Sequence, residues 1–268
     1  MTKTILITGA SGTVASATAK FLKNQGHNVI GVSRSVKDKD HYTQTRQIDL
    51  LSSNDLDHLE ELLEGVDAVF HLAWNLEIEN FDTDEKWPEN IGMFKNILEA
   101  SKTAEVPIFI NGSSIHAGTG SIPAYTVEAS LEDTPQPFKD SIDPDKDFDL
   151  RRERPEKLLS PLVEDPDSIY GESKIETEKR LRNATNSGSF ELGVSIRIGG
   201  VNAEDKEELE GEPYYPSLRW SHKDLGRTVE NIVTADLGEK NGYHQFYGVS
   251  DNEGRIFSIE NSFTTPKN

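Results

Sequence analysis

Tyr170 and Lys174 are the two residues whose types and spacing most directly suggest acid–base chemistry. Residues four apart on a helix lie on one face, one turn from each other. Tyrosine has an ordinary pKa of about 10 and is a poor base at neutral pH, but a neighbouring ammonium favours the phenolate and lowers that pKa. The pair therefore predicts a general acid–base group, although Tyr-x-x-x-Lys alone is common by chance.

Ser114 is the expected third member of this group. It follows a short apolar run, residues 107–112, which reads as a buried strand. If a parallel sheet brings Ser114 opposite the helix, its hydroxyl can bond the same substrate oxygen as Tyr170. Hydride transfer needs such a set beside a hydride-accepting cofactor, so Ser114, Tyr170 and Lys174 are the predicted catalytic residues.

A glycine-rich turn near the N-terminus could hold that cofactor. Residues 4–7 form an apolar, β-branched strand pattern, and residues 14–23 carry apolar side chains at helical spacing. Gly9 allows a tight turn between them, and Gly12 lets the backbone approach a pyrophosphate at the positive end of the helix. The predicted dinucleotide contacts in this turn are Gly9, Ser11, Gly12, Thr13 and Val14.

The next expected strand, residues 27–33, ends where such folds contact the adenosine ribose. An acidic residue there would bind the 2′-hydroxyl, whereas a nearby arginine accommodates a 2′-phosphate. The sequence has Ser33 followed by Arg34, with no carboxylate before Asp38. We therefore expect NADP to be preferred over NAD.

Later strand ends supply the remaining cofactor contacts. Residues 48–50 close a third short strand, where Asp49 is expected to cap the adenine, and residues 68–73 form a buried strand. Its carboxyl end lies at the edge of the sheet where ligands bind, and a substrate pocket is expected to begin at Asn75. The predicted contacts from these two strand ends are Asp49, Leu50, Leu72, Ala73 and Trp74.

Repeated strand–helix units predict an α/β protein with a Rossmann-type, doubly wound parallel sheet. We expect one domain over residues 1–268, with a small C-terminal substrate-binding portion at about 199–222 and 240–268. Between about 118 and 166 the periodicity disappears, and the segment is rich in proline and acidic residues. Such a long irregular stretch is usually functional, and we expect an insertion beside the site.

The composition narrows the function class. The formal net charge of −19 argues against a surface for nucleic acid or anionic membranes. Without cysteine there is no thiolate chemistry, and no metal is expected. No apolar run approaches a membrane span and no signal-peptide pattern is present, so we expect a cytoplasmic protein. Its acidity suggests the hydrated surface of proteins from a salty cytoplasm.

These motifs together resemble the extended short-chain dehydrogenase/reductase family, which includes NAD-dependent epimerases and dehydratases. The resemblance rests on residues 8–15 (with Ala15 in place of the last glycine), 49–50, 71–73, 113–114, 170–174 and 197–199. It implies an NAD or NADP cofactor, adds Asn90 and Ile198 to the cofactor contacts, and implies that Lys174 also holds the nicotinamide ribose. Relatives often dimerise, so a homo-oligomer is expected.

Within that family the C-terminal half is most similar to the short uronate and aldose dehydrogenases, which oxidise the anomeric carbon of a sugar. The substrate residues implied are Asn75, His116, Tyr214 and Arg219. Ile115 replaces an Asn that bonds substrate in those relatives, and Tyr214 replaces an Arg that would grip a uronate carboxylate. A neutral aldose, or a phosphorylated sugar held by Arg151, Arg152 or Arg219, therefore fits no worse than a uronate.

Two other functions stay open. A nucleotide-sugar epimerase or dehydratase would use the same three residues with a retained cofactor. Dehydratases usually place Asp-Glu where this chain has Ile115 and His116, and epimerases usually carry a larger C-terminal domain. A non-enzymatic NADP(H) sensor would commonly have lost the Tyr or the Lys. Oxidation of a sugar is the function we expect.

Overall fold

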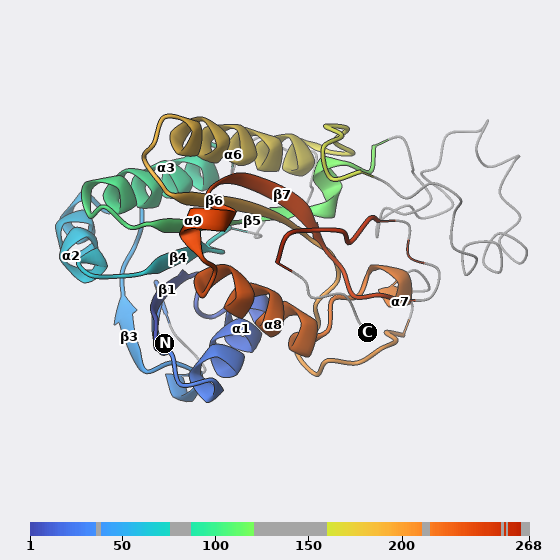
Figure 1. Cartoon of the computed structure of the whole chain (residues 1–268), viewed down its shortest axis with the longest axis horizontal. Helices are drawn as coiled ribbons and strands as arrows, with labels where there is room; N and C mark the ends of the chain where they lie inside the picture. Colours follow the sequence, from blue (N-terminus) through green and yellow to red (C-terminus); the bar gives the residue numbers. More distant parts are fainter. Residues whose placement is uncertain are drawn as a thin grey trace, which may run out of the picture.

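The computed structural model describes residues 1–35, 39–75, 87–120, 160–210, 215–252, 255 and 257–263. In these residues seven strands form a single sheet (Figure 1). The strands are β1 (Thr4–Thr8), β2 (Asn28–Ser33), β3 (Gln44–Gln47), β4 (Ala68–His71), β5 (Ile108–Ser114), β6 (Leu192–Ile198) and β7 (Gly242–Gly248).

The strand order is β3-β2-β1-β4-β5-β6-β7, and every neighbouring pair is parallel. The order reverses between β1 and β4, where the chain crosses from one half of the sheet to the other. In open parallel sheets, ligands bind beyond the carboxyl ends of the strands at such a switch point. The ends of β1, β4 and β5 are therefore where the site must be sought.

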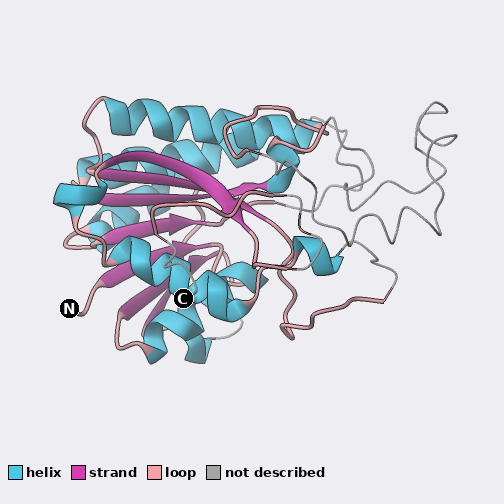
Figure 2. Cartoon of the chain, turned by 45° about the vertical axis from the view of Figure 1, so that its right-hand side comes forward, coloured by secondary structure: helices cyan, strands magenta, loops and turns pink. Residues whose placement is uncertain are grey.

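Helices cover both faces of the sheet (Figures 1 and 2). Successive strand residues point to opposite faces, so Ile5 and Ile7 pack in one core cluster while Leu6 packs in the other. The first cluster lies under α1 and α8, and the second under α2, α3 and α6. The helices are α1 (Thr13–Asn24), α2 (Ser53–Leu63), α3 (Trp87–Thr103), α6 (Ile169–Asn186), α7 (Tyr215–Leu218), α8 (His222–Val233) and α9 (Leu237–Lys240), with short 3-10 turns η1 (Lys39–His41) and η3 (Ile115–Ala117).

The predicted fold class, a doubly wound parallel α/β sheet, is confirmed, with differences at the element ends. The third strand ends at Gln47, so residues 48–50 belong to the turn after it, and β4 ends at His71 rather than at residue 73. The four-residue helices α7 and α9 are too short to produce a helical sequence period. Most of the expected insertion, residues 121–159, lies outside the described residues.

Candidate active site

The turn after β1 lies directly against the backbone that follows β4. Gly9 has a φ of +68°, a conformation that favours glycine, and a Cβ there would lie 2.7 Å from the carbonyl carbon of Leu72. Thr8 fixes the same segment, since its Oγ accepts hydrogen bonds from the backbone N–H groups of Leu72 and Ala73, each at 3.1 Å. The hydroxyl hydrogen of Thr8 is then left to bond Nδ1 of His71, 2.9 Å away.

Helix α1 begins in a way that suits an anionic ligand. Its N-cap is Gly12, and among the described residues no side chain caps its first turn. Uncapped N–H groups at a helix N-terminus attract phosphates. The hydroxyl of Ser11 donates to the carbonyl of Ser35, which ties this turn to the end of β2. The turn thus offers backbone donors and a glycine surface that a diphosphate can approach.

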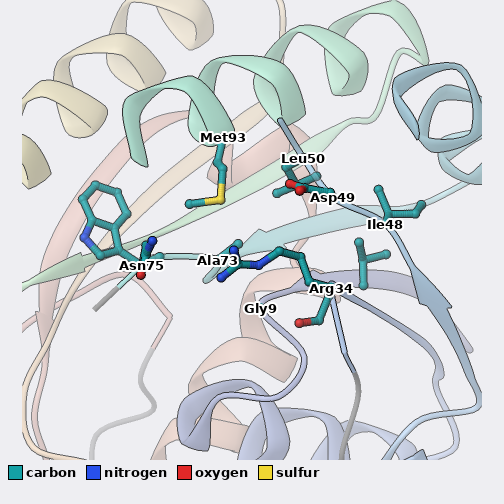
Figure 3. A pocket seen from close by; sticks show the side chains of 11 residues that line it. Gly9, Arg34, Ile48, Asp49, Leu50, Ala73, Asn75 and Met93 are labelled. Carbon is teal, nitrogen blue, oxygen red and sulfur yellow. The ribbon is translucent and has the colours of Figure 1, made fainter. Parts of the chain in front are cut away.

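A cavity of about 80 Å³ lies beside this turn (Figure 3). It joins the ends of three strands, because Gly9 follows β1, Arg34 follows β2 and Ala73 follows β4. Figure 3 shows the side chain of Arg34 reaching across the opening toward Ala73. The full lining is Gly9, Val32, Ser33, Arg34, Ile48, Asp49, Leu50, Ala73, Trp74, Asn75 and Met93. Seven of the predicted cofactor contacts therefore meet here: Gly9, Ser33, Arg34, Asp49, Leu50, Ala73 and Trp74.

The three predicted catalytic residues come together at the carboxyl end of β5, and we call them the Ser–Tyr–Lys cluster. Ser114, the last residue of β5, hydrogen-bonds Tyr170 in the first turn of α6. Lys174, one turn further along α6, is only 4 % exposed. Its ammonium donates to the carbonyl of Gly112 at 2.9 Å and lies 3.4 Å from the centroid of the Trp74 ring.

The expected lowering of the Tyr170 pKa by Lys174 is absent from this arrangement. Burial raises the pKa of Tyr170 to about 12; the bond from Ser114 opposes this rise, and the charge of Asp167 adds to it. Burial also lowers the pKa of Lys174 to about 7, against the opposing charge of Glu178. The ammonium lies 5.4 Å from the centroid of the Tyr170 ring and bonds a carbonyl rather than the phenol.

A buried ion pair that the sequence analysis missed anchors this cluster. Glu178 and Arg197 are each fully buried and joined by two bonds of 2.9 Å, Nε to Oε1 and Nη2 to Oε2. Ser113 also donates to Glu178 at 2.5 Å, so strand β5 is tied to helix α6 beside the reactive residues. The spacing of Lys174 and Glu178, four residues apart on one helix, was the available signal.

The loop after β4 is held by Asn90, the residue that the family motif placed at the start of α3. Its Oδ1 accepts from the backbone N–H of Asn75 at 2.7 Å, and its Nδ2 donates to the Asn75 carbonyl at 3.3 Å. Trp74, the neighbouring residue, lines the cavity and also meets Tyr170 edge-on with ring centroids 6.1 Å apart. Trp74 therefore lies between the cavity and the Ser–Tyr–Lys cluster.

The remaining predicted residues are placed as follows. Ile198 is opposite Ser114 in the β5–β6 register, and His116 follows Ser114 in η3. Arg219 lies further along the chain, where its guanidinium forms an ion pair with Asp205 at 2.7 Å. The predicted substrate residues Tyr214, Arg151 and Arg152 lie outside the described residues.

The described residues contain neither a candidate metal site nor a membrane-spanning helix. No group of three or more histidine, aspartate or glutamate side chains there could hold a metal ion. No described helix is both long and apolar enough to cross a membrane.

The model of the NAD dependent epimerase/dehydratase family matches residues 5–142, just over half of the chain. The chain belongs to this family, which is the extended short-chain dehydrogenase/reductase family expected from the motifs. The matched segment contains the glycine turn, the cavity lining and Ser114.

Two curated relatives have different activities. The chain is 28 % identical to the GDP-mannose 3,5-epimerase of Arabidopsis thaliana over 198 residues, 73 % of this chain and 45 % of that protein. It is 28 % identical to a decarboxylating sterol-4-alpha-carboxylate 3-dehydrogenase of Dictyostelium discoideum over 139 residues, 47 % of this chain and 42 % of that protein. The chain thus spans less than half the length of these relatives.

Solved structures agree with the fold. The uronate dehydrogenase of Agrobacterium tumefaciens superposes with a TM-score of 0.68 at 21 % identity, covering 96 % of this chain and 80 % of that one. This likeness agrees with the parallel sheet and flanking helices of the chain.

Proposed function

We propose that this protein oxidises a sugar at its anomeric carbon by transferring a hydride to a nicotinamide cofactor. The observation that carries the proposal is the Ser–Tyr–Lys cluster, in which Ser114 bonds Tyr170 and Lys174 lies one helical turn away. Trp74 connects this cluster to the cavity beside the glycine turn, because it lines the cavity and its ring centroid lies 3.4 Å from the Lys174 ammonium. This adjacency supports hydride transfer between a cofactor in the cavity and a substrate at the cluster.

NAD(P)⁺, when bound, supplies the hydride acceptor. Tyr170 takes the proton of the substrate hydroxyl, and Ser114 orients that oxygen by a second hydrogen bond. With a pKa of about 12, Tyr170 needs a nearby positive charge to act as a base at neutral pH. We propose that the Lys174 ammonium, which bonds the Gly112 carbonyl and lies 5.4 Å from the tyrosine ring centroid in this structure, supplies this charge once substrate and cofactor are bound.

NADP is the proposed preferred cofactor. Ser33 and Arg34 occupy the end of β2, and both line the cavity. Arg34 is exposed and reaches across the opening (Figure 3). A guanidinium there can form a bidentate pair of hydrogen bonds with a 2′-phosphate. The described carboxylate that lines the cavity, Asp49, instead accepts from the backbone N–H of Leu51 at 3.0 Å.

Epimerisation of a nucleotide sugar is the second candidate. It is favoured by the match to GDP-mannose 3,5-epimerase, which extends over 73 % of this chain. An epimerase would use the same acid–base residues but return the hydride to the sugar, so that no reduced cofactor accumulates.

The test is absorbance at the reduced-nicotinamide band with NAD or NADP, across aldoses, uronates and sugar phosphates at low and high salt. A signal with one sugar class supports the proposal and identifies the substrate. Each reaction, and parallel reactions with nucleotide sugars, is also analysed by chromatography. A changed sugar without accumulated reduced cofactor would establish the epimerase instead, and unchanged sugars throughout would refute both.

A further inference from the structure

Asp167, just before helix α6, belongs to none of the sequence motifs and takes no part in the proposed mechanism. Its side chain is 7 % exposed, and three donors surround its carboxylate. Oδ2 accepts from Nδ1 of His116 and from the hydroxyl of Thr119, each at 2.7 Å, and Oδ1 accepts from the hydroxyl of Ser168 at 2.7 Å. A nearly buried carboxylate with this many donors is held in a fixed position.

These bonds decide where the proton of His116 lies. Burial opposes ionisation of Asp167, but the bonds from His116, Ser168 and Thr119 outweigh it and lower the pKa of Asp167. An ionised carboxylate has no hydrogen to donate, so the hydrogen between the two residues is on Nδ1 of His116. In the neutral imidazole, Nε2 is then a hydrogen-bond acceptor.

His116 is attached to the Ser–Tyr–Lys cluster on two sides. Its backbone N–H donates to the hydroxyl of Ser114 at 3.3 Å. Its ring meets the Tyr170 ring edge-on, with centroids 5.6 Å apart. The backbone also joins the two segments, because the N–H of Asp167 donates to the carbonyl of His116 at 3.2 Å, and a Cβ on Gly171 would collide with that carbonyl.

We propose that Asp167 is a positioning residue that keeps His116 in the Nδ1-protonated tautomer, so that Nε2 accepts a hydrogen bond from a sugar hydroxyl neighbouring the one that Tyr170 deprotonates. The proposal rests on the proposed oxidation of a sugar. It specifies a substrate with two adjacent free hydroxyls. A carboxylate that fixes a histidine tautomer in this way is familiar from other acid–base sites.

The first test needs no substrate. Long-range ¹H–¹⁵N spectra of the whole protein report the tautomer of each of the seven histidines, and His116→Gln assigns the signal. At a pH where the histidine ring is neutral, the expected signal is protonation of His116 at Nδ1, which shifts toward the Nε2-protonated form in Asp167→Asn. A wild-type ring protonated at Nε2, or a variant with an unchanged signal, would overturn the role of Asp167.

The second test uses the best sugar from the absorbance panel and its monodeoxy analogues. Asp167→Asn should lower kcat/KM by about 10–100-fold, mainly through KM, because the bond to the hydroxyl exists before the chemical step. For one monodeoxy analogue, wild type and variant should have nearly equal kcat/KM, since the hydroxyl in question is missing. An equal loss with every analogue, or a loss below about threefold with the parent sugar, would contradict the proposal.

Two variants separate positioning from folding. Asp165→Asn removes the same charge two residues earlier and should leave tautomer and KM unchanged. Thr119→Val removes one of the three donors and should give a smaller rise in KM; it substitutes for Asp167→Asn if that variant loses its native circular dichroism. A panel without any signal would refute the sugar oxidation, and with it the hydroxyl contact, while the spectra still decide the tautomer.

Discussion

The glycine turn offers a ligand mainly backbone groups, held by the hydroxyls of Thr8 and Ser11 and with the exposed Arg34 nearby. The Ser–Tyr–Lys cluster instead offers side chains that are largely buried. At the turn, Gly9 touches the Leu72 backbone and helix α1 begins without a side-chain cap among the described residues. At the cluster, Lys174 is 4 % exposed and bonds a carbonyl and an indole face. Backbone N–H groups can bind a phosphate with little dependence on the neighbouring side chains, but the pKa of a buried ammonium depends on the groups around it.

This difference predicts that the chemical step and cofactor affinity can be changed separately by substitution. Substitutions in the cluster should affect chemistry and the pH dependence of stability. Substitutions at the turn should affect cofactor affinity and leave the chemical groups in place. Four predictions test this separation, beginning with the largest expected effect.

Tyr170→Phe should lower turnover by about 10²–10⁴-fold, because it removes the group that accepts the substrate proton. Cofactor affinity, measured by fluorescence titration, should stay within a few-fold of wild type. Tyr243→Phe is the matched control, since it removes another partly buried hydroxyl, bonded to Gln245 at 2.7 Å, outside the cluster. Near-wild-type activity of Tyr170→Phe would show that the base is a different residue.

Gly9→Ala should weaken dinucleotide binding at least about tenfold. The left-handed backbone disfavours alanine by about 1–3 kcal/mol, and the new Cβ would press on the Leu72 backbone. Calorimetric titration with NADP measures the loss. Gly65→Ala has a similar φ of +72° with nothing within 4 Å, so it should lose stability but keep its affinity. If the two variants bound NADP with equal affinity, the glycine turn would not be part of the cofactor site.

Lys174→Met should be more stable than wild type at pH 7 and below, by a few kcal/mol. The pKa of Lys174 falls from 10.5 in the unfolded chain to about 7 when folded, so between these values the unfolded chain binds more protons. Wild-type stability therefore gains up to about 1.4 kcal/mol per pH unit above pH 7, and the advantage of the variant shrinks toward pH 9.

Urea unfolding at pH 6, 7, 8 and 9 measures this difference. Lys179→Met, on the same helix but half exposed and paired with Glu164, should show a difference from wild type that does not vary with pH. A constant difference for Lys174→Met as well would mean that Lys174 does not titrate near neutrality.

Arg34→Gln should have the smallest effect, a loss of about tenfold in NADP affinity with NAD affinity unchanged. A bond from a guanidinium to a phosphate contributes about 1.5–3 kcal/mol, reduced at an exposed position. Arg46→Gln, on the adjoining strand β3, removes a comparable exposed charge and should alter neither affinity. Equal losses for both cofactors would place Arg34 away from the 2′ position.

Much of the fold could be predicted because its signals are local. The apolar strand pattern, the glycine turn and the helical spacing of residues 4–23 lie within twenty residues, and the structure has β1 and α1 there. The end of β3 was displaced by three residues, because burial continues past the last ladder bond: Ile48 and Leu50 are buried but lie beyond the sheet. The end of β4 was displaced by two residues, Leu72 and Ala73, which are half-buried. Such buried turns look like strand in a sequence.

Sequence analysis predicted only those site residues that belong to a recognised motif. Ser114, Tyr170 and Lys174 meet as expected, yet Glu178, Arg197 and Asp167 were not assigned any role. Each of these three is charged and buried, and a charge in a sequence is ordinarily expected in solvent. A charged side chain can be buried when groups that pair with it are buried beside it, and these groups are known only from the structure. They are Arg197 for Glu178, and the hydroxyls and imidazole for Asp167.

By itself the sequence determined the parallel sheet, the turn that can face a phosphate, and the spacing of Tyr170 and Lys174 on one helix face. These follow from short-range sterics and periodicity, which a stretch of ten to twenty residues specifies. The tertiary structure decided the electrostatics: Lys174 bonds Gly112 and Trp74, and Asp167 bonds His116 across 51 residues of chain. A pKa or a tautomer depends on which groups surround an atom in space, and that is set only when strands β4 and β5 and helix α6 pack together.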